Sequence, residues 1–257
     1  MAVIETWGLT HHYGSTVGIE ALDLAVEEGE VFGFLGPNGA GKTTTIRLLL
    51  DLIRPTRGEA ALFGRPTADP GVRDRVGYLP GELVLDGRLT GTETLAFLGR
   101  LGTPAAAPER RAELCQRLGL ASGDLRRRVR EYSRGMKQKL GLAAAFQHDP
   151  ELLILDEPTT GLDPLVREVV FELMAEARRA GRTVFHSSHV LSEVGRTCDR
   201  VAVLRDGRLA ALLRVDEVRR ASVRTMVVDF GADPPMDELV SAGAQVLETD
   251  GGRGGLR

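Results

Sequence analysis

The apolar positions of this chain fall into short blocks that repeat two different spacings. Residues 31–35, 152–155 and 183–187 form short, mostly apolar runs, which is typical of strands buried on both faces of a parallel sheet. Residues 46–53 and 164–180 instead carry apolar side chains at helical spacing. Strands that alternate with helices in this way predict an α/β fold with a mainly parallel sheet.

The residues before the first of these strands show a different pattern, with frequent turns. Segments 3–4 and 21–26 are predicted strands, and the turn 28–30 leads into Val31. This order predicts a small N-terminal antiparallel β subdomain. Segments 58–64 and 75–80 are further strand-like pieces, and 201–204 closes a hairpin with the turn 206–207.

From about residue 89 to 146 the spacing becomes helical. Thr90 and Thr92 are candidate N-caps for a helix over 93–101, and further helices are predicted over 112–120 and 135–146. A helical block that interrupts a series of strands predicts an inserted α-helical subdomain.

The character of the chain changes after residue 214. Segments 223–230 and 245–249 are strand-like, and 236–241 has the pattern of a short helix. We expect one large domain over residues 4–214 and interpret 215–257 as the start of a small accessory βαβ element, which this sequence need not complete.

Composition narrows the classes of partner. The formal net charge is −3, so the composition gives no overall basic field, and aromatic residues make up only 5% of the chain, so base-stacking side chains are few. Both values disfavour a nucleic-acid partner. Cys115 and Cys198 have neither metal-binding nor redox spacing, which is typical of reduced thiols in the cytosol. The first residues lack an apolar signal core and no apolar run approaches 18 residues, so we expect any membrane role to act through a partner.

The segment with the most specific chemistry joins the strand 31–35 to the helix 46–53. It reads GPNGAGKTT: Gly36, Pro37, Asn38, Gly39, Ala40, Gly41, Lys42, Thr43 and Thr44. Glycines let the backbone N–H groups face an anion at a helix N-terminus, where the helix dipole also favours negative charge. In such a phosphate loop the lysine reaches the β- and γ-phosphates and the first hydroxyl ligates Mg²⁺. The alternative, a glycine-rich turn that caps an ordinary helix, is disfavoured by the strand and helix on either side, so we predict a P-loop NTPase core.

Two further predicted strands also end in polar residues. Asp156 and Glu157 follow the strand 152–155, and His189 follows 183–187. Because ligands of open α/β sheets lie at the carboxyl ends of the strands, Asp156 can hold Mg²⁺, Glu157 can orient or deprotonate water, and His189 can donate to the γ-phosphate. The alternatives are a charged pair that opens a loop and a histidine that begins the helix 190–196. His186 lies within its strand and is interpreted as a packed residue.

Four more motifs follow the phosphate loop in the sequence: YSRGMKQKL at 132–140, LLILDEP at 152–158, TTGLDP at 159–164 and HSSH at 186–189. Together with the phosphate loop, and in this order, they resemble the ATP-binding-cassette (ABC) ATPases over about residues 4–210. The YSRGM and YLPG segments resemble the branch of this family that exports drugs and antibiotics.

The resemblance implies the following site. ATP and Mg²⁺ would be the ligands, and Tyr13 corresponds to the aromatic residue that stacks on adenine; the alternative for Tyr13 is a surface residue in a Tyr-Gly turn. Ser133 and Gly135 correspond to the signature residues that cap the γ-phosphate bound by the opposite subunit. The segment 161–163 corresponds to the loop that links the two sites.

The resemblance also implies partners and a location. Two copies, or one copy and a paralogous cassette, would pair head-to-tail around two ATP. A separate multi-helix permease subunit would hold the pair at the cytoplasmic face of the cell membrane and export a drug, antibiotic or lipid-like substrate. The alternative functions are a soluble regulatory ABC ATPase that is not coupled to transport and a nucleotide-binding switch without hydrolysis.

This sequence departs from the family pattern at two places. Arg134 and Met136 replace signature residues, and Gly81 stands where the family has a glutamine that ligates Mg²⁺, with Glu82 as the next candidate. The basic run 126–130 before the signature is interpreted as a solvated face or, alternatively, as a field that attracts the partner's triphosphate.

Overall fold

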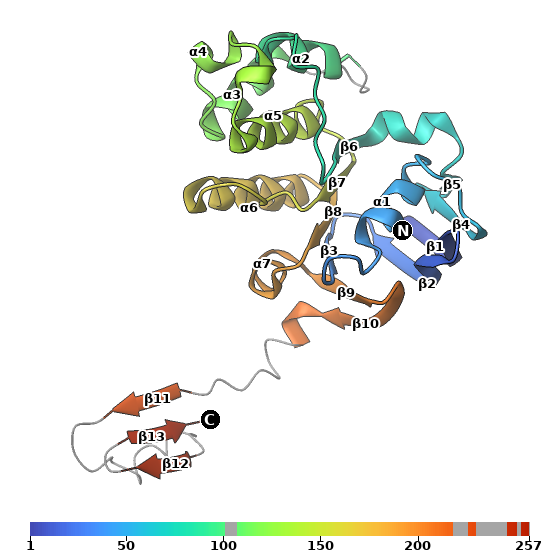
Figure 1. Cartoon of the computed structure of the whole chain (residues 1–257), viewed down its shortest axis with the longest axis vertical. Coiled ribbons are helices and arrows are strands. Elements are labelled where there is room, and N and C mark those ends of the chain that lie inside the picture. The colour runs from blue at the N-terminus through green and yellow to red at the C-terminus, as the bar shows by residue number, and fades with distance from the viewer. Residues whose placement is uncertain (101–106, 218–225, 230–245, 251–252, 257) are drawn as a thin grey trace. The chain divides into compact units, whose positions relative to one another are not determined.

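The chain forms two compact units, which are described separately. The computed structural model describes residues 1–100, 107–217, 226–229, 246–250 and 253–256. The first unit comprises Met1–Val215 and the second Asp216–Arg257 (Figure 1).

The first unit is built on a six-stranded sheet. Its strands, in spatial order, are β10 (Arg208–Arg214), β9 (Arg200–Arg205), β3 (Val31–Leu35), β8 (Thr183–Ser188), β7 (Leu152–Asp156) and β6 (Val76–Leu79). All neighbours are parallel except β10, which pairs antiparallel with β9 through the turn at Asp206 and Gly207. The predicted α/β fold with a mainly parallel sheet and a closing hairpin is confirmed.

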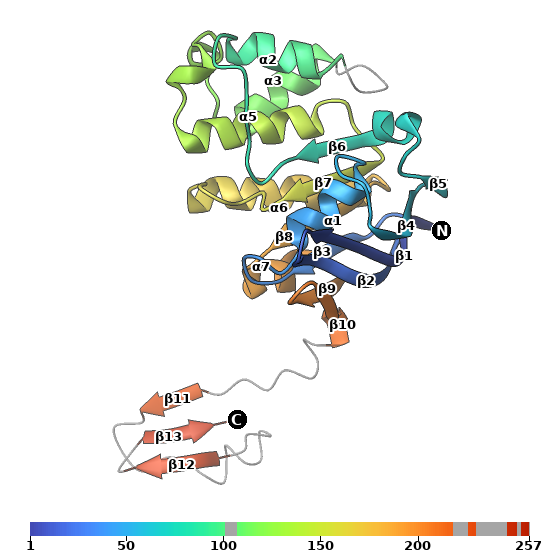
Figure 2. The ribbon, with the colours of Figure 1, turned by 45° about the vertical axis from the view of Figure 1, so that its right-hand side comes forward.

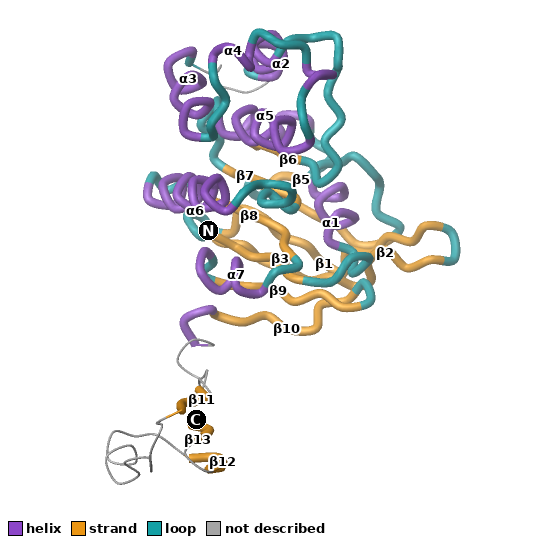
Figure 3. The backbone as a smooth tube through the Cα atoms, turned by 60° about the vertical axis from the view of Figure 1, so that its left-hand side comes forward, coloured by secondary structure: helices purple, strands orange, loops and turns teal. Residues whose placement is uncertain are grey.

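Side chains alternate between the two faces of this sheet, and both faces are buried. Phe32, Phe34, Ile154 and Phe185 pack in one apolar cluster with α1 (Lys42–Leu49) and the N-terminal strands. The intervening residues pack in a second cluster, with helices α6 (Pro164–Arg179) and α7 (Leu191–Thr197). Figure 3 shows the strands between α1 on one side and α6 and α7 on the other. Burial on both faces explains why these strands read as continuous apolar runs rather than as alternating ones.

A second, antiparallel sheet covers the α1 side. Its order is β2 (Thr16–Glu27), β1 (Ala2–Tyr13), β4 (Arg57–Leu62) and β5 (Arg65–Pro66). The predicted N-terminal antiparallel subdomain is confirmed, although its first two strands are longer than the apolar segments that indicated them. They extend into a hairpin whose exposed end carries Tyr13.

The segment between β6 and β7 forms the predicted group of helices, seen together above the sheet in Figure 2. It contains α2 (Gly91–Leu98), α3 (Pro108–Arg117), α4 (Ser122–Leu125), the 3₁₀ turn Val129–Glu131 and α5 (Arg134–Phe146). Thr90 is the N-cap of α2, in a capping box with Glu93. Thr92 lies inside the helix, so its prediction as a cap was wrong. The helix predicted over 93–101 begins two residues earlier and ends at Leu98, because Gly99 and Arg100 form a turn. Residue 101 lies outside the described residues.

In the second unit the structure describes three strands, β11 (Met226–Asp229), β12 (Val246–Asp250) and β13 (Arg253–Leu256). The first two confirm the predicted strands, and both pair antiparallel with β13, which lies between them. β13 was not predicted, because its glycine-rich sequence has no apolar pattern. The predicted helix 236–241 lies outside the described residues.

Three expectations drawn from composition and from charge and apolar runs concern described residues. Cys115 and Cys198 are buried free thiols. No helix in the described ranges has the length and apolar character needed to span a bilayer. In the basic run 126–130 the arginines are exposed and Val129 is buried.

Candidate functional site

The polar residues at three strand ends lie next to one another. β8 is the neighbour of both β3 and β7, and the register places Leu35 opposite Ser188 and Asp156 opposite Ser187. The phosphate loop, the Asp156-Glu157 pair and His189 therefore leave the same edge of the sheet. This edge is the place where ligands of open α/β sheets bind.

The loop 36–44 has the backbone that its glycines predict. Gly39 and Gly41 adopt positive φ angles of 82° and 102°. At Gly41 a Cβ atom would lie 2.5 Å from the carbonyl oxygen of Gly18 on β2, so the position requires glycine for space as well as for conformation. Helix α1 begins at Lys42, directly after this turn, and its free N–H groups face the loop.

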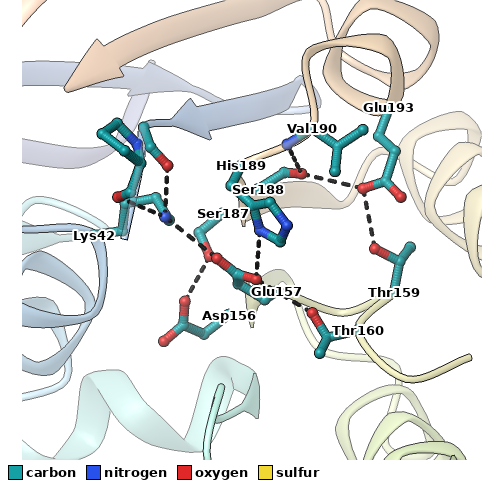
Figure 4. Close-up of polar contacts among 12 residues, drawn as sticks. Lys42, Asp156, Glu157, Thr159, Thr160, Ser187, Ser188, His189, Val190 and Glu193 are labelled. Carbon is teal, nitrogen blue, oxygen red and sulfur yellow. Dashed lines mark hydrogen bonds and ion pairs between the residues drawn. The ribbon is translucent and has the colours of Figure 1, made fainter. Parts of the chain in front are cut away.

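Lys42 is the basic residue at the centre of the loop and is only 6% exposed. Its Nζ donates to the carbonyl oxygens of Gly36 (2.7 Å) and Pro37 (3.2 Å) and lies 3.3 Å from Oε1 of Glu157 (Figure 4). An ammonium group held in this way places a full positive charge inside the loop. It is the charge that a triphosphate would meet there.

Thr43 and Asp156 supply oxygen donors beside this charge. The Thr43 hydroxyl donates to Oδ2 of Asp156 at 2.7 Å, and Asp156 is fully buried. Burial, assisted by the Asp156 charge, raises the pKa of Tyr78, on the neighbouring strand β6, to about 12. A hydroxyl and a carboxylate oxygen at hydrogen-bond distance are the donor types that Mg²⁺ prefers, so the residues present fit this ion.

Glu157 follows Asp156 in a strained conformation. Its φ angle is 51°, which is uncommon for a residue with a side chain. Its N–H donates to Oγ of Ser187 (2.9 Å) and its carbonyl accepts from Gln138 (3.4 Å), so contacts on both sides hold this conformation. The Glu157 carboxylate is thereby directed at Lys42 on one side and, through Oε2, at Nδ1 of His189 (2.8 Å) on the other.

These residues surround an open cavity of about 770 Å³. Its lining, which includes Asp156 and Glu157, also contains loop residues and the aromatic ring that was predicted to stack on adenine: Tyr13, Pro37, Asn38, Gly39, Gly41, Lys42, Thr43 and Thr44. Tyr13 is 46% exposed, and its Oη lies 3.5 Å from Oγ1 of Thr44. A flat ring at the open edge of a charged cavity suits a base attached to a phosphate chain.

In the signature-like segment 132–140, residues other than the two predicted capping residues contact this group. Ser133 is the N-cap of α5, where its Oγ accepts from the N–H of Met136. A Cβ atom at Gly135 would lie 3.1 Å from the carbonyl oxygen of Gly161. Among the described residues, the cavity lining includes Arg134 but neither Ser133 nor Gly135. The two predicted capping residues are thus not brought to the site of their own chain.

The structure gives a physical reason for the glycine at position 81. A Cβ atom there would lie 2.9 Å from Oδ2 of Asp156, so no larger side chain fits unless Asp156 moves. Glu82, the next residue, is exposed and lines the cavity together with Glu157.

Two residues outside the predicted site hold the acidic pair. Ser187 donates to Oδ1 of Asp156 (2.5 Å) while it accepts the N–H of Glu157, and Gln138 donates to the carbonyl of Pro158 (3.1 Å). Ser187 lies in the HSSH segment and Gln138 in YSRGMKQKL, but neither motif indicated these contacts with the acidic pair. His186, by contrast, is packed as interpreted: its Nε2 lies 3.0 Å from Sγ of Cys198, and burial lowers its pKa to about 4, so it stays neutral near pH 7.

Comparison with known proteins now identifies the family. The model of the ABC transporter family matches residues 19–160. The chain is 46% identical over 213 residues to the daunorubicin/doxorubicin resistance ATP-binding protein DrrA of Streptomyces peucetius, covering 81% of this chain and 64% of that protein. It is 40% identical over 235 residues to the Nod factor export ATP-binding protein I of Cupriavidus pinatubonensis, covering 90% and 72%. The chain spans 61% to 64% of the length of several such relatives.

A solved structure agrees with these relatives. The ATP-binding subunit of an ABC transporter superposes with a TM-score of 0.77 at 31% identity, covering 93% of this chain and 98% of that one. This likeness confirms the predicted fold. The resemblance to the branch that contains drug- and antibiotic-export proteins is confirmed by the relatives, which include DrrA and the bacitracin transport ATP-binding protein BcrA. The chain belongs to the ABC transporter family.

Proposed function

We propose that this chain binds and hydrolyses ATP as the motor subunit of an ABC exporter. The observation that carries the proposal is the arrangement of Glu157 between Lys42 (3.3 Å) and His189 (2.8 Å) at the edge of a cavity that the phosphate loop lines. A base, a cation and a second proton-bearing group within contact of one another are the parts that phosphoryl transfer to water requires.

Each residue has a role in this proposal. The N–H groups of the loop and the Lys42 ammonium bind the phosphates, and Tyr13 stacks on the adenine. Glu157 orients and deprotonates the attacking water, and His189 holds the γ-phosphate while its Nδ1 steadies Glu157. Thr43 and Asp156 would hold Mg²⁺, which supplies electrostatic stabilisation of the phosphate charge when bound.

The site requires a second subunit in this proposal. Ser133 and Gly135 carry a helix N-terminus with free N–H groups but lie away from the cavity of their own chain. We infer that they complete the site of a second cassette in a head-to-tail dimer, either a copy of this chain or a paralogue. ATP binding closes such a dimer because only the triphosphate contacts both halves, and hydrolysis reopens it.

Mixing two inactive variants tests the shared site. Lys42→Ala and Ser133→Ala should each be nearly inactive alone, because a symmetric dimer of either has no intact site. In a mixed dimer the intact loop of one chain faces the intact signature of the other. We expect the 1:1 mixture to recover at least about a tenth of wild-type ATP turnover, since about half of randomly formed dimers are mixed. A mixture that only sums the two separate rates would show that each chain's site is complete by itself.

Export through a separate permease is the second part of the proposal. The exporter relatives make a drug, antibiotic or lipid-like substrate the favoured class, and the permease would bring the chain to the cytoplasmic face of the membrane. We expect the chain to copurify with membranes only when a multi-helix partner is present. A chain that stays in the supernatant and keeps full ATPase activity in cells with and without that partner would instead indicate a soluble regulatory ATPase.

A further inference from the structure

A buried acidic residue that has no role in the proposed chemistry lies beside the site. Glu193, in the first turn of α7, is 9% exposed. Its Oε2 accepts hydrogen bonds from the hydroxyls of Thr159 (3.0 Å) and Ser188 (3.1 Å) (Figure 4). Thr159 belongs to the loop after β7 and Ser188 to the end of β8, so one carboxylate joins the two segments that carry Glu157 and His189.

The environment of this carboxylate is unusual. Among the described residues, no lysine, arginine or histidine nitrogen lies within the 4.0 Å of Glu193 that would make an ion pair. Burial of a charge is costly, and here only the two hydroxyls and the N-terminus of α7 offset that cost, so the residue adds little stability. The residue is therefore better explained by what its acceptor oxygen does to its neighbours than by its contribution to folding.

A carboxylate only accepts hydrogen bonds, and this fixes the direction of the bonds around it. Ser188 must donate its single proton to Glu193, which leaves its oxygen free to accept the N–H of Val190 (3.0 Å). The two contacts close the turn that carries His189. On the other side of Glu193, the backbone carbonyl of Thr159 accepts the N–H of Leu162 (3.2 Å), which closes a turn in the loop after Glu157. Because the Thr159 hydroxyl donates to Glu193, this contact restrains that loop.

Within this framework the Glu157 side chain is held by two groups from the same two segments. Nδ1 of His189 and Oγ1 of Thr160 lie 2.8 Å and 3.2 Å from its Oε2. Neither segment is connected to the other by helix or strand pairing beyond the ends of β7 and β8. The contact between Glu157 and His189 thus depends on side-chain links across the two loops.

We propose that Glu193 is a positioning residue that holds His189 against Glu157 by tying the His189 turn to the loop after β7. This inference rests on the proposed function, because it assigns Glu193 an effect on the same hydrolytic pair. A displacement of about 1 Å in such a pair can cost about a hundredfold in rate.

The test compares Glu193→Ala with Glu193→Gln. Alanine removes both contacts, so we expect kcat to fall about thirtyfold, while KM for ATP and the affinity for ADP stay within about threefold because the phosphate loop is unchanged. Both hydroxyls donate to the same oxygen, so the amide oxygen of glutamine can accept them, and Glu193→Gln should keep at least about a third of the rate. Glu168→Ala is the matched control, because Glu168 is an exposed residue of α6 paired with Arg196.

A double-mutant cycle with His189→Ala separates positioning from a general structural role. If Glu193 acts through His189, adding Glu193→Ala to His189→Ala should lower kcat less than about threefold further. Thr159→Val, which removes one hydroxyl but keeps the shape of the side chain, should lower kcat in the same direction and provides the test if Glu193→Ala does not fold.

Three results would overturn the proposal: the same loss of kcat in the wild-type and His189→Ala backgrounds, a loss confined to KM, or a Glu193→Gln variant as slow as Glu193→Ala. A wild-type chain without ATP turnover would instead contradict the proposed function itself, and this outcome is distinct from a wild-type enzyme that is insensitive to changes at Glu193.

Discussion

Replacing Lys42 with alanine is expected to reduce ATP turnover by at least about a hundredfold and to weaken the binding of both ATP and ADP. The Lys42 ammonium is buried in the loop, held by the carbonyls of Gly36 and Pro37. Alanine cannot supply a charge at this place, and the remaining N–H groups bind phosphate as neutral donors. Turnover by a phosphate-release assay and nucleotide affinity by calorimetry measure the two effects.

The same substitution also changes the protein without nucleotide. Glu157 loses its cation at 3.3 Å and keeps only the partly exposed His189 and the Thr160 hydroxyl. The thermal melting of Lys42→Ala should therefore be measured alongside its activity. Arg65→Ala is the control, because it removes a cation from an exposed ion pair. A Lys42→Ala protein that is folded and turns over ATP at the normal rate would contradict the assignment of the phosphate loop.

The parts of the fold that local sequence determines were predicted well. The apolar runs around β3 and β7 and the glycines before Lys42 act over a few residues, so their pattern indicates strand, turn and helix directly. Long-range order could not be obtained in this way. The insertion of β8 between β3 and β7 is a matter of packing, and it is this order that brings Asp156 and the loop together.

The same distinction between local and long-range contacts applies to the candidate site. Motifs such as GPNGAGKTT and LLILDEP name residues that are close in sequence, whereas the residues that hold them act from a distance. Ser187 reaches Asp156 across 31 residues and Glu193 reaches Thr159 across 34. The reason for Gly81 is also spatial, since a side chain there would require Asp156 to move.

Replacing Glu157 with glutamine is expected to separate ATP binding from hydrolysis. The amide keeps the size of the side chain and can still accept from His189 and Thr160, but it cannot accept a proton from water, so turnover should fall about a hundred- to ten-thousandfold. Binding should persist, because Lys42 and the N–H groups of the loop are unchanged, and Lys42 is relieved of a competing carboxylate at 3.3 Å.

The oligomeric state of Glu157→Gln in ATP then tests whether a second subunit closes over the site. If the triphosphate closes two cassettes head-to-tail and only hydrolysis reopens them, Glu157→Gln should accumulate as a dimer in ATP and remain a monomer in ADP. Size-exclusion chromatography with light scattering measures this difference, and Glu168→Gln, which neutralises an exposed glutamate, provides the control. A Glu157→Gln protein with ordinary ATPase activity would remove Glu157 from the chemistry. A slow variant that stays monomeric in ATP would keep Glu157 as the base and contradict the closed dimer, because nothing would then link hydrolysis to a change that a permease could use.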